Sequence, residues 1–68
     1  MPIINISMVE GRSAEQKEAM GQAITRVVQE TIGAPLDTIN IVINEIPPEL
    51  WFSNGASIQS RRESEKPG

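Results

Sequence analysis

The chain contains no cysteine and no histidine among its 68 residues, and its aromatic residues are one tryptophan and one phenylalanine. Without histidine or cysteine, nucleophilic catalysis by a Ser-His or Cys-His triad is excluded, and so are most transition-metal sites. Any catalysis must therefore use carboxylates, arginine, lysine, backbone groups or a terminal amine. We accordingly expect neither a metal nor another cofactor.

A basic surface and a long apolar run are also lacking. The formal net charge is −3, whereas a nucleic-acid surface needs a basic stripe and usually stacking aromatic side chains. No apolar run approaches the roughly 18 residues of a membrane span, and the start of the chain has no signal-peptide pattern. Absence of cysteine fits a reducing compartment. We expect a cytoplasmic protein with no nucleic-acid or membrane partner.

Size limits the chain to one small domain. A chain of about 60 residues buries only about 60% of its unfolded surface, and this one has no disulfide to support a small core. The usual remaining support is oligomerisation. We therefore expect a multimer.

The first predicted element is a strand over residues 3–9. Its side chains alternate, with Ile4, Ile6 and Met8 on one face and polar residues on the other. Such alternation is typical of a half-buried strand.

A helix should follow this strand. Ser13 and Gln16 have the spacing of a capping box, and Gly33 followed by Pro35 is a helix stop signal. Gly21 interrupts the helix, where it either allows another backbone to approach or is simply tolerated at a cost of up to about 1 kcal/mol. The apolar positions recur at three- and four-residue spacing and are Met20, Ala23, Ile24, Val27, Val28 and Ile32.

A second strand is predicted over residues 38–46, which are rich in β-branched side chains. Strand, helix and strand in this order form a right-handed βαβ unit with parallel strands. Two strands alone have exposed edges and too little core, so subunits must complete each other. Residues 53–55, Ser-Asn-Gly, are a turn signal that could form a tight hairpin. We assign a domain to residues 1–58 and a polar, flexible C-terminal tail to residues 59–68.

Pro2 is the candidate for chemistry. Removal of Met1 would leave proline as the first residue, with a secondary amine on a rigid ring. An ordinary α-amino group has a pKa of about 7.7 to 8.0, and burial or a neighbouring cation lowers it. The pKa would then approach neutral pH, where general acid-base catalysis is most efficient. Met-Pro also begins proteins for which it has no catalytic role, so Pro2 alone does not decide the function.

A longer pattern supports Pro2. The Met-Pro start is followed by Glu-Gly-Arg-Ser-Ala-Glu-Gln-Lys at residues 10–17, and later by Gly-Ala-Pro at residues 33–35. Over Met1 to Gly55 the chain resembles the 4-oxalocrotonate tautomerase family of the tautomerase superfamily. This resemblance implies an α+β fold in which each subunit is a βαβ unit with a short C-terminal hairpin. It also implies a homo-oligomer, with a hexamer expected and a trimer or a heterohexamer as alternatives.

The resemblance also assigns site residues. Pro2 corresponds to the general base and Arg12 to the arginine that binds a substrate carboxylate. Asn40 stands where the family's best dicarboxylate tautomerases have a second arginine, and it supplies no charge. Trp51 stands in place of a pocket phenylalanine, with Phe52 next to it. Taken alone, Arg12 could be a solvated turn residue and Trp51 an oligomer-interface anchor.

The implied activity is that of an isomerase, a keto-enol tautomerase acting on a small 2-hydroxydienoate or enol carboxylate, as in aromatic degradation. One alternative is dehalogenase- or decarboxylase-type hydration of a three-carbon acid. Such relatives use a carboxylate near the hairpin, where this chain has Ser53, and Glu49 lies off the matching position. The other alternative is a non-catalytic subunit of a hetero-oligomer.

Overall fold

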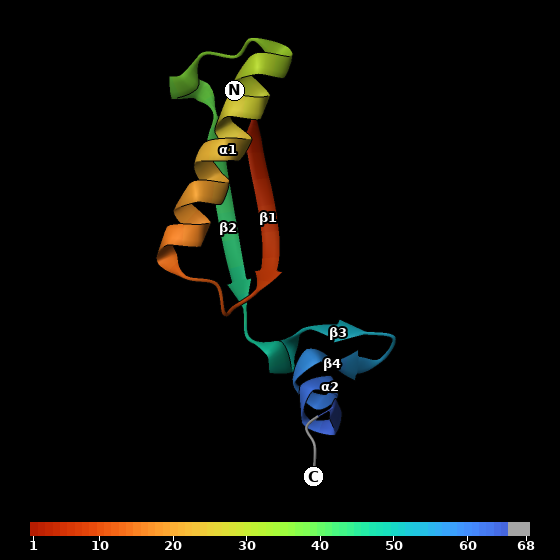
Figure 1. The fold of residues 1–68 in the computed structure, drawn as a ribbon. Coiled ribbons are helices and arrows are strands. Elements are labelled where there is room, and N and C mark those ends of the chain that lie inside the picture. The colour runs from red at the N-terminus through yellow and green to blue at the C-terminus, as the bar shows by residue number, and fades with distance from the viewer. Residues whose placement is uncertain (66–68) are drawn as a thin grey trace.

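The computed structural model describes residues 1–65. Figure 1 shows two long strands beside one long helix, followed by a small hairpin and a second helix. In chain order the elements are β1 (Ile3–Val9), α1 (Ala14–Ile32), β2 (Asn40–Ile46), β3 (Phe52–Ser53), β4 (Ala56–Ser57) and α2 (Ile58–Glu65). The predicted βαβ unit with a C-terminal hairpin is confirmed.

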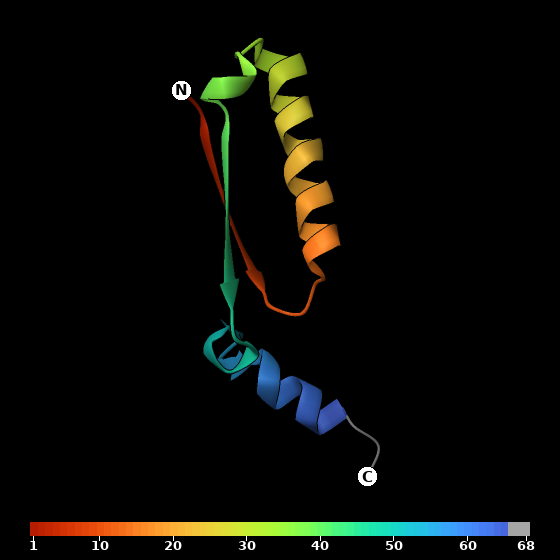
Figure 2. The ribbon, with the colours of Figure 1, turned by 90° about the vertical axis from the view of Figure 1, so that its left-hand side faces the viewer.

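The two long strands form a parallel pair covered on one face. Their register runs from Ile3 opposite Asn40 to Val9 opposite Ile46. Seen edge-on in Figure 2, helix α1 lies on one side of this pair, and no element of residues 1–65 covers the other side. In β1 the predicted alternation is confirmed, because Ile4 and Ile6 are half-buried while their neighbours in the strand are exposed.

Both ends of α1 follow the predicted signals. The Ser13 hydroxyl accepts a hydrogen bond from the Gln16 backbone N–H at 3.1 Å, and the Gln16 side chain accepts one from the Ser13 N–H at 3.0 Å. At the other end, Gly33 has a φ of 69° and its N–H donates to the Gln29 carbonyl at 2.9 Å. A left-handed residue at this place is the common helix ending, and glycine adopts it without a steric penalty.

The capping box gives a stability prediction. Ser13→Ala is expected to lower the free energy of unfolding by about 1 kcal/mol, because it removes the acceptor for a helix N–H. The measurement is urea unfolding followed by circular dichroism at one fixed protein concentration. Ser60→Ala, at an exposed serine of α2, is the matched control. An equal loss of stability in both variants would contradict a capping role.

One boundary differs from the prediction. The second strand begins at Asn40 and not at residue 38, because Leu36–Thr38 forms a 3₁₀ turn. Thr38 closes this turn with two hydrogen bonds to the Pro35 carbonyl, from its N–H at 3.0 Å and from its hydroxyl at 2.7 Å. A threonine hydroxyl that bonds the local backbone competes with strand formation, and the β-branched pattern did not reveal this.

The hairpin turn follows the Asn-Gly rule. Asn54 has a φ of 54° and Gly55 a φ of 80°, so both central residues are left-handed, as a type I′ turn requires. The turn joins Phe52–Ser53 to Ala56–Ser57 in antiparallel pairing. The hairpin expected at this place is therefore present.

The segment expected to be a flexible tail is helical over most of its length. Helix α2 covers Ile58–Glu65. The Ser57 hydroxyl accepts the Ser60 N–H at 3.0 Å, and Gln59 donates to Glu63 one turn later at 2.8 Å. These local bonds satisfy polar groups of the segment, so its polarity does not prevent helix formation. Residues 66–68 lie outside the described residues, and the domain boundary at residue 58 stays a prediction.

The described chain encloses no core of its own. Its radius of gyration is 15.9 Å, against roughly 11 Å for a compact domain of this length. No side chain in residues 1–65 is fully buried, and large apolar side chains such as Ile3 and Phe52 are 59% and 64% exposed. The small, open sheets are consistent with the predicted completion by oligomerisation. No helix in the described part is long and apolar enough to cross a membrane.

Candidate active site

Pro2 and Asn40 lie together at the start of the parallel pair. The Pro2 carbonyl accepts a hydrogen bond from the Asn40 backbone N–H at 3.0 Å, and Asn40 stands opposite Ile3 in the register. Pro2 is half-buried. The structure includes Met1, so the Pro2 nitrogen is here part of a peptide bond. The backbone thus fixes the site's candidate base beside its candidate amide donor.

Arg12 lies at the opposite end of the strands. It follows β1, whose seven residues at about 3.3 Å each make a strand roughly 20 Å long. Trp51 and Phe52 come after the C-terminal end of β2, so they too are at the far end from Pro2, as Figure 1 shows for the strand ends. One chain therefore holds the predicted site as two separate halves, Pro2 with Asn40 and Arg12 with the aromatic pair.

Arg12 borders a small groove between β1 and α1. This groove has a volume of about 210 Å³ and is lined by Met8, Arg12, Gln16, Lys17 and Met20. Lys17 is already paired, because its Nζ lies 2.6 Å from Glu45 Oε1 on β2. Within residues 1–65 Arg12 has no ion-pair partner, so it is the cation of this groove that a ligand carboxylate can meet. The methionines give the groove an apolar wall.

Arg12 also borders a second groove, and there the structure adds a residue that sequence reasoning missed. The groove has a volume of about 420 Å³, and its lining includes both Arg12 and Arg62 of α2. The signal that could have found Arg62 is Ser57, a good N-cap residue directly before a helix-compatible, mostly polar segment. Polarity alone predicts a flexible tail there.

The aromatic pair belongs to the hairpin. Trp51 is half-buried and its carbonyl accepts the Ile58 N–H at 2.9 Å, which ties the start of the hairpin to α2. Phe52 is 64% exposed and stands opposite Ser57. An exposed phenylalanine in a small hairpin has apolar surface available for another surface to cover.

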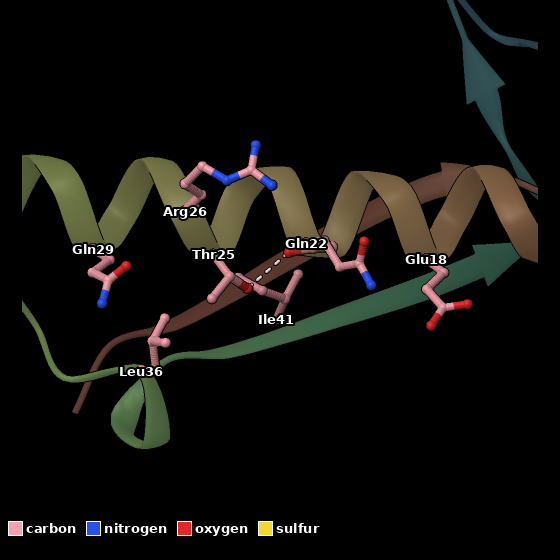
Figure 3. Close-up of a pocket in the computed structure, with 8 residues that line it drawn as sticks. Glu18, Gln22, Thr25, Arg26, Gln29, Leu36 and Ile41 are labelled. Atoms are coloured by element: carbon pink, nitrogen blue, oxygen red, sulfur yellow. Dashed lines mark hydrogen bonds between the residues drawn. The ribbon is translucent and has the colours of Figure 1, made fainter.

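A third groove contains none of the predicted site residues. It has a volume of about 550 Å³ and lies between α1 and β2, as Figure 3 shows. Within it, the Thr25 hydroxyl donates to the Gly21 carbonyl at 2.7 Å. A Cβ on Gly21 would meet no atom within 4 Å, so nothing in the chain itself requires glycine there. The groove is lined by Glu18, Gly21, Gln22, Thr25, Arg26, Gln29, Leu36 and Ile41.

Residues 1–65 contain no group of three or more carboxylate side chains placed to hold a metal ion. The predicted site residues of the two halves offer an amine, a guanidinium group, an amide and aromatic rings.

Known proteins resemble this chain over most of its length. A family profile described as tautomerase enzyme matches residues 2–61. The 2-hydroxymuconate tautomerase of Comamonas testosteroni is 42% identical over 57 residues, which are 84% of this chain and 90% of that protein. Among solved structures, TomN, a 4-oxalocrotonate tautomerase homologue in the tomaymycin biosynthetic pathway, superposes with a TM-score of 0.91 at 38% identity, covering 96% of this chain and 100% of TomN. A heterohexamer 4-oxalocrotonate tautomerase from Chloroflexus aurantiacus superposes with a TM-score of 0.83 at 34% identity, covering 87% and 95% of the two chains.

Proposed function

The chain belongs to the tautomerase family, and we propose that this isomerase acts on a small 2-hydroxydienoate or other enol carboxylate. Support comes from the relative that acts on 2-hydroxymuconate and from the residues that the fold places at the two strand ends. Pro2, a cation and an apolar wall are the groups that an enol carboxylate needs.

The proposed reaction moves one proton. With Met1 removed, the Pro2 amine is the general base: it takes the proton of the enol hydroxyl, and the electron pair moves through the double bonds toward a carbon. The protonated amine then returns the proton to that carbon, which completes the ketone without loss of any atom. Arg12 binds the carboxylate through its planar fork of N–H donors. Trp51 and Phe52 exclude water, which favours the unprotonated amine.

The observation that carries this proposal is the separation of Pro2 from Arg12 within one chain, which supports a site shared between chains. The β1 strand pairs only with β2 in the described chain, so its other edge has free backbone groups. If two copies pair their β1 edges antiparallel about a twofold axis, the start of one strand meets the end of the other. Pro2 of one copy would then lie near Arg12 of the next. A homo-oligomer, with a hexamer expected, would therefore complete each active site.

Asn40 modifies the proposed substrate range. Its backbone is fixed beside Pro2, and its side chain makes a long contact of 3.4 Å with the Thr38 carbonyl. An amide can donate a hydrogen bond to a developing enolate oxygen, but it lacks the charge of an arginine, which forfeits about 1 to 2 kcal/mol. We therefore propose slower turnover of dicarboxylate dienols than in relatives that have two arginines.

The direct test combines intact mass with activity. We expect mass spectrometry of the purified protein to show that Met1 is absent, and the protein to convert 2-hydroxymuconate and phenylenolpyruvate to their keto forms in a spectrophotometric assay. A sample treated so that Met1 is retained is the control and should be inactive, because its Pro2 nitrogen is an amide. Full activity with Met1 in place would contradict the proposed base.

A specific observation favours the alternative in which this chain is one subunit of a hetero-oligomer. The Chloroflexus aurantiacus protein is a heterohexamer, and Asn40 leaves this chain without the second arginine. In such an assembly a partner chain would supply the missing cation, and the chain alone would be inactive. Hydration of a three-carbon acid has less support, because Ser53 is not an acid and its carbonyl accepts a hydrogen bond from Arg61.

A further inference from the structure

We propose that Glu45 of β2 is a positioning residue of the active site, which holds the loop of Arg12 in place through Lys17. This inference rests on the proposed function, in which Arg12 binds the substrate carboxylate. Glu45 Oε1 lies 2.6 Å from Lys17 Nζ, and Lys17 lines the same groove of about 210 Å³ as Arg12. Glu45 is not among the residues that line this groove, so it acts on the carboxylate only through other residues.

Glu45 breaks the apolar pattern of its strand. Ile41 and Ile43 are half-buried on the face of β2 that α1 covers, and Glu45 follows at the same spacing of two. Because successive side chains of a strand alternate between its two faces, Glu45 belongs to the covered face, opposite Met8 in the register. A carboxylate that loses water there needs a cation. Lys17 supplies it, and the Lys17 and Glu45 side chains are only 25% and 36% exposed.

Lys17 connects Glu45 to the Arg12 loop through the backbone. The Lys17 N–H donates to the Ser13 carbonyl at 3.1 Å, and Ser13 directly follows Arg12. On the other side of the loop, the Glu10 N–H donates at 3.0 Å to the carbonyl of the β2 residue that follows Glu45. Two neighbouring residues of β2 thus fix both ends of the loop.

The loop depends on such anchors because it contains Gly11. This glycine has a φ of 136°, and a Cβ there would meet no atom of residues 1–65 within 4 Å. Glycine is the least restricted residue, and here no packing within the described chain restrains it. The ion pair of Glu45 with Lys17 is partly exposed and adds little to the stability of the fold. Its loss should therefore leave the chain folded and displace the Arg12 guanidinium, which misplaces the substrate carboxylate.

A simpler role for Glu45 would be to neutralise the charge of Lys17. Without Glu45, the groove of Arg12 would carry a second free cation, which attracts a carboxylate. Glu45→Gln and Lys17→Met change the charge of this region in opposite directions, but both remove the same link. The double variant also removes the link and leaves the net charge unchanged. These three variants therefore distinguish positioning from charge.

The test is the KM and kcat of the assembled protein with 2-hydroxymuconate. Glu45→Gln and Lys17→Met should each raise KM about fivefold, the upper effect of a partly exposed ion pair, and keep kcat within about twofold of wild type. The double variant should show the same KM as either single one, because the link is already lost. Lys17→Arg retains the ion pair and should keep KM within about twofold. Glu18→Gln, at the neighbouring exposed position of α1, is the matched control and should behave like wild type.

Two results would overturn the positioning role. One is a lower KM for Glu45→Gln together with a higher KM for Lys17→Met, which groove charge alone explains. The other is a KM equal to that of Glu18→Gln in both single variants. Light scattering checks the assembly of each sample. If a single variant does not assemble, the double variant decides: a raised KM supports positioning, and a wild-type KM overturns it.

Failure of the proposed function is recognised separately. If the wild type converts no enol, that function fails, and the same variants are compared by calorimetry for their Kd with muconate, an unreactive dicarboxylate. Weaker muconate binding in both single variants would still support the positioning of Arg12 by Glu45. Unchanged Kd values would overturn it.

Discussion

Pro2→Ala is expected to lower kcat by about a hundredfold or more, within the range that a positioned general base contributes, with a much smaller change in KM. Alanine at this position still offers an amine once Met1 is removed, but that amine is primary and rotates freely about its bond to Cα. The proline nitrogen is held by its ring, and its residue is fixed by the hydrogen bond between the Pro2 carbonyl and Asn40. A loss in kcat with KM retained indicates that the group acts in the transition state.

The measurement is the initial rate of ketonisation of 2-hydroxymuconate, with intact mass recorded for every sample. Pro35→Ala is the matched control, since Pro35 lies in the turn before β2 and is not one of the proposed site residues. It should keep kcat within about twofold of wild type. Equal kcat values for Pro2→Ala and wild type, both without Met1, would remove the proline from the mechanism.

The parts of the fold that local chemistry determines were predictable from the sequence. Ser13 and Gln16 specify the start of α1, Gly33 specifies its end, and the Asn-Gly pair at 54–55 specifies the hairpin turn, because each requires only its neighbours in the chain. The helix α2 was not predicted, since its polar sequence has little apolar periodicity. Its order depends on contacts such as that of Arg61 with Ser53, which tertiary structure alone supplies.

The candidate site was predictable only as a set of residue types. The sequence motif predicted that Pro2 and Arg12 both belong to the site. Their separation within one chain, however, follows from the length of β1 and from the parallel register. Arg62 was not among the predicted site residues, because residues 59–68 were expected to be a flexible tail. Sequence patterns report what each segment prefers, whereas a site formed between chains depends on which free edges meet.

Mixing two inactive variants is expected to restore activity if sites are shared between chains. Arg12→Ala should lower kcat/KM about a hundredfold, because it removes a charged fork from the substrate carboxylate. When Pro2→Ala and Arg12→Ala chains are unfolded together at equal amounts and refolded, about a quarter of the sites should receive Pro2 from one chain and Arg12 from another, both intact. The recovered rate should be about a quarter of wild type.

Controls separate this result from simple mixing. The two variants mixed without unfolding should recover nothing while their assemblies stay intact, and each variant refolded alone should remain inactive. A site built within one chain predicts no recovery under any of these conditions, because every chain then lacks one of its two groups. Recovery therefore depends on the roughly 20 Å that β1 places between Pro2 and Arg12, a distance too great for one small carboxylate to bridge within a single copy.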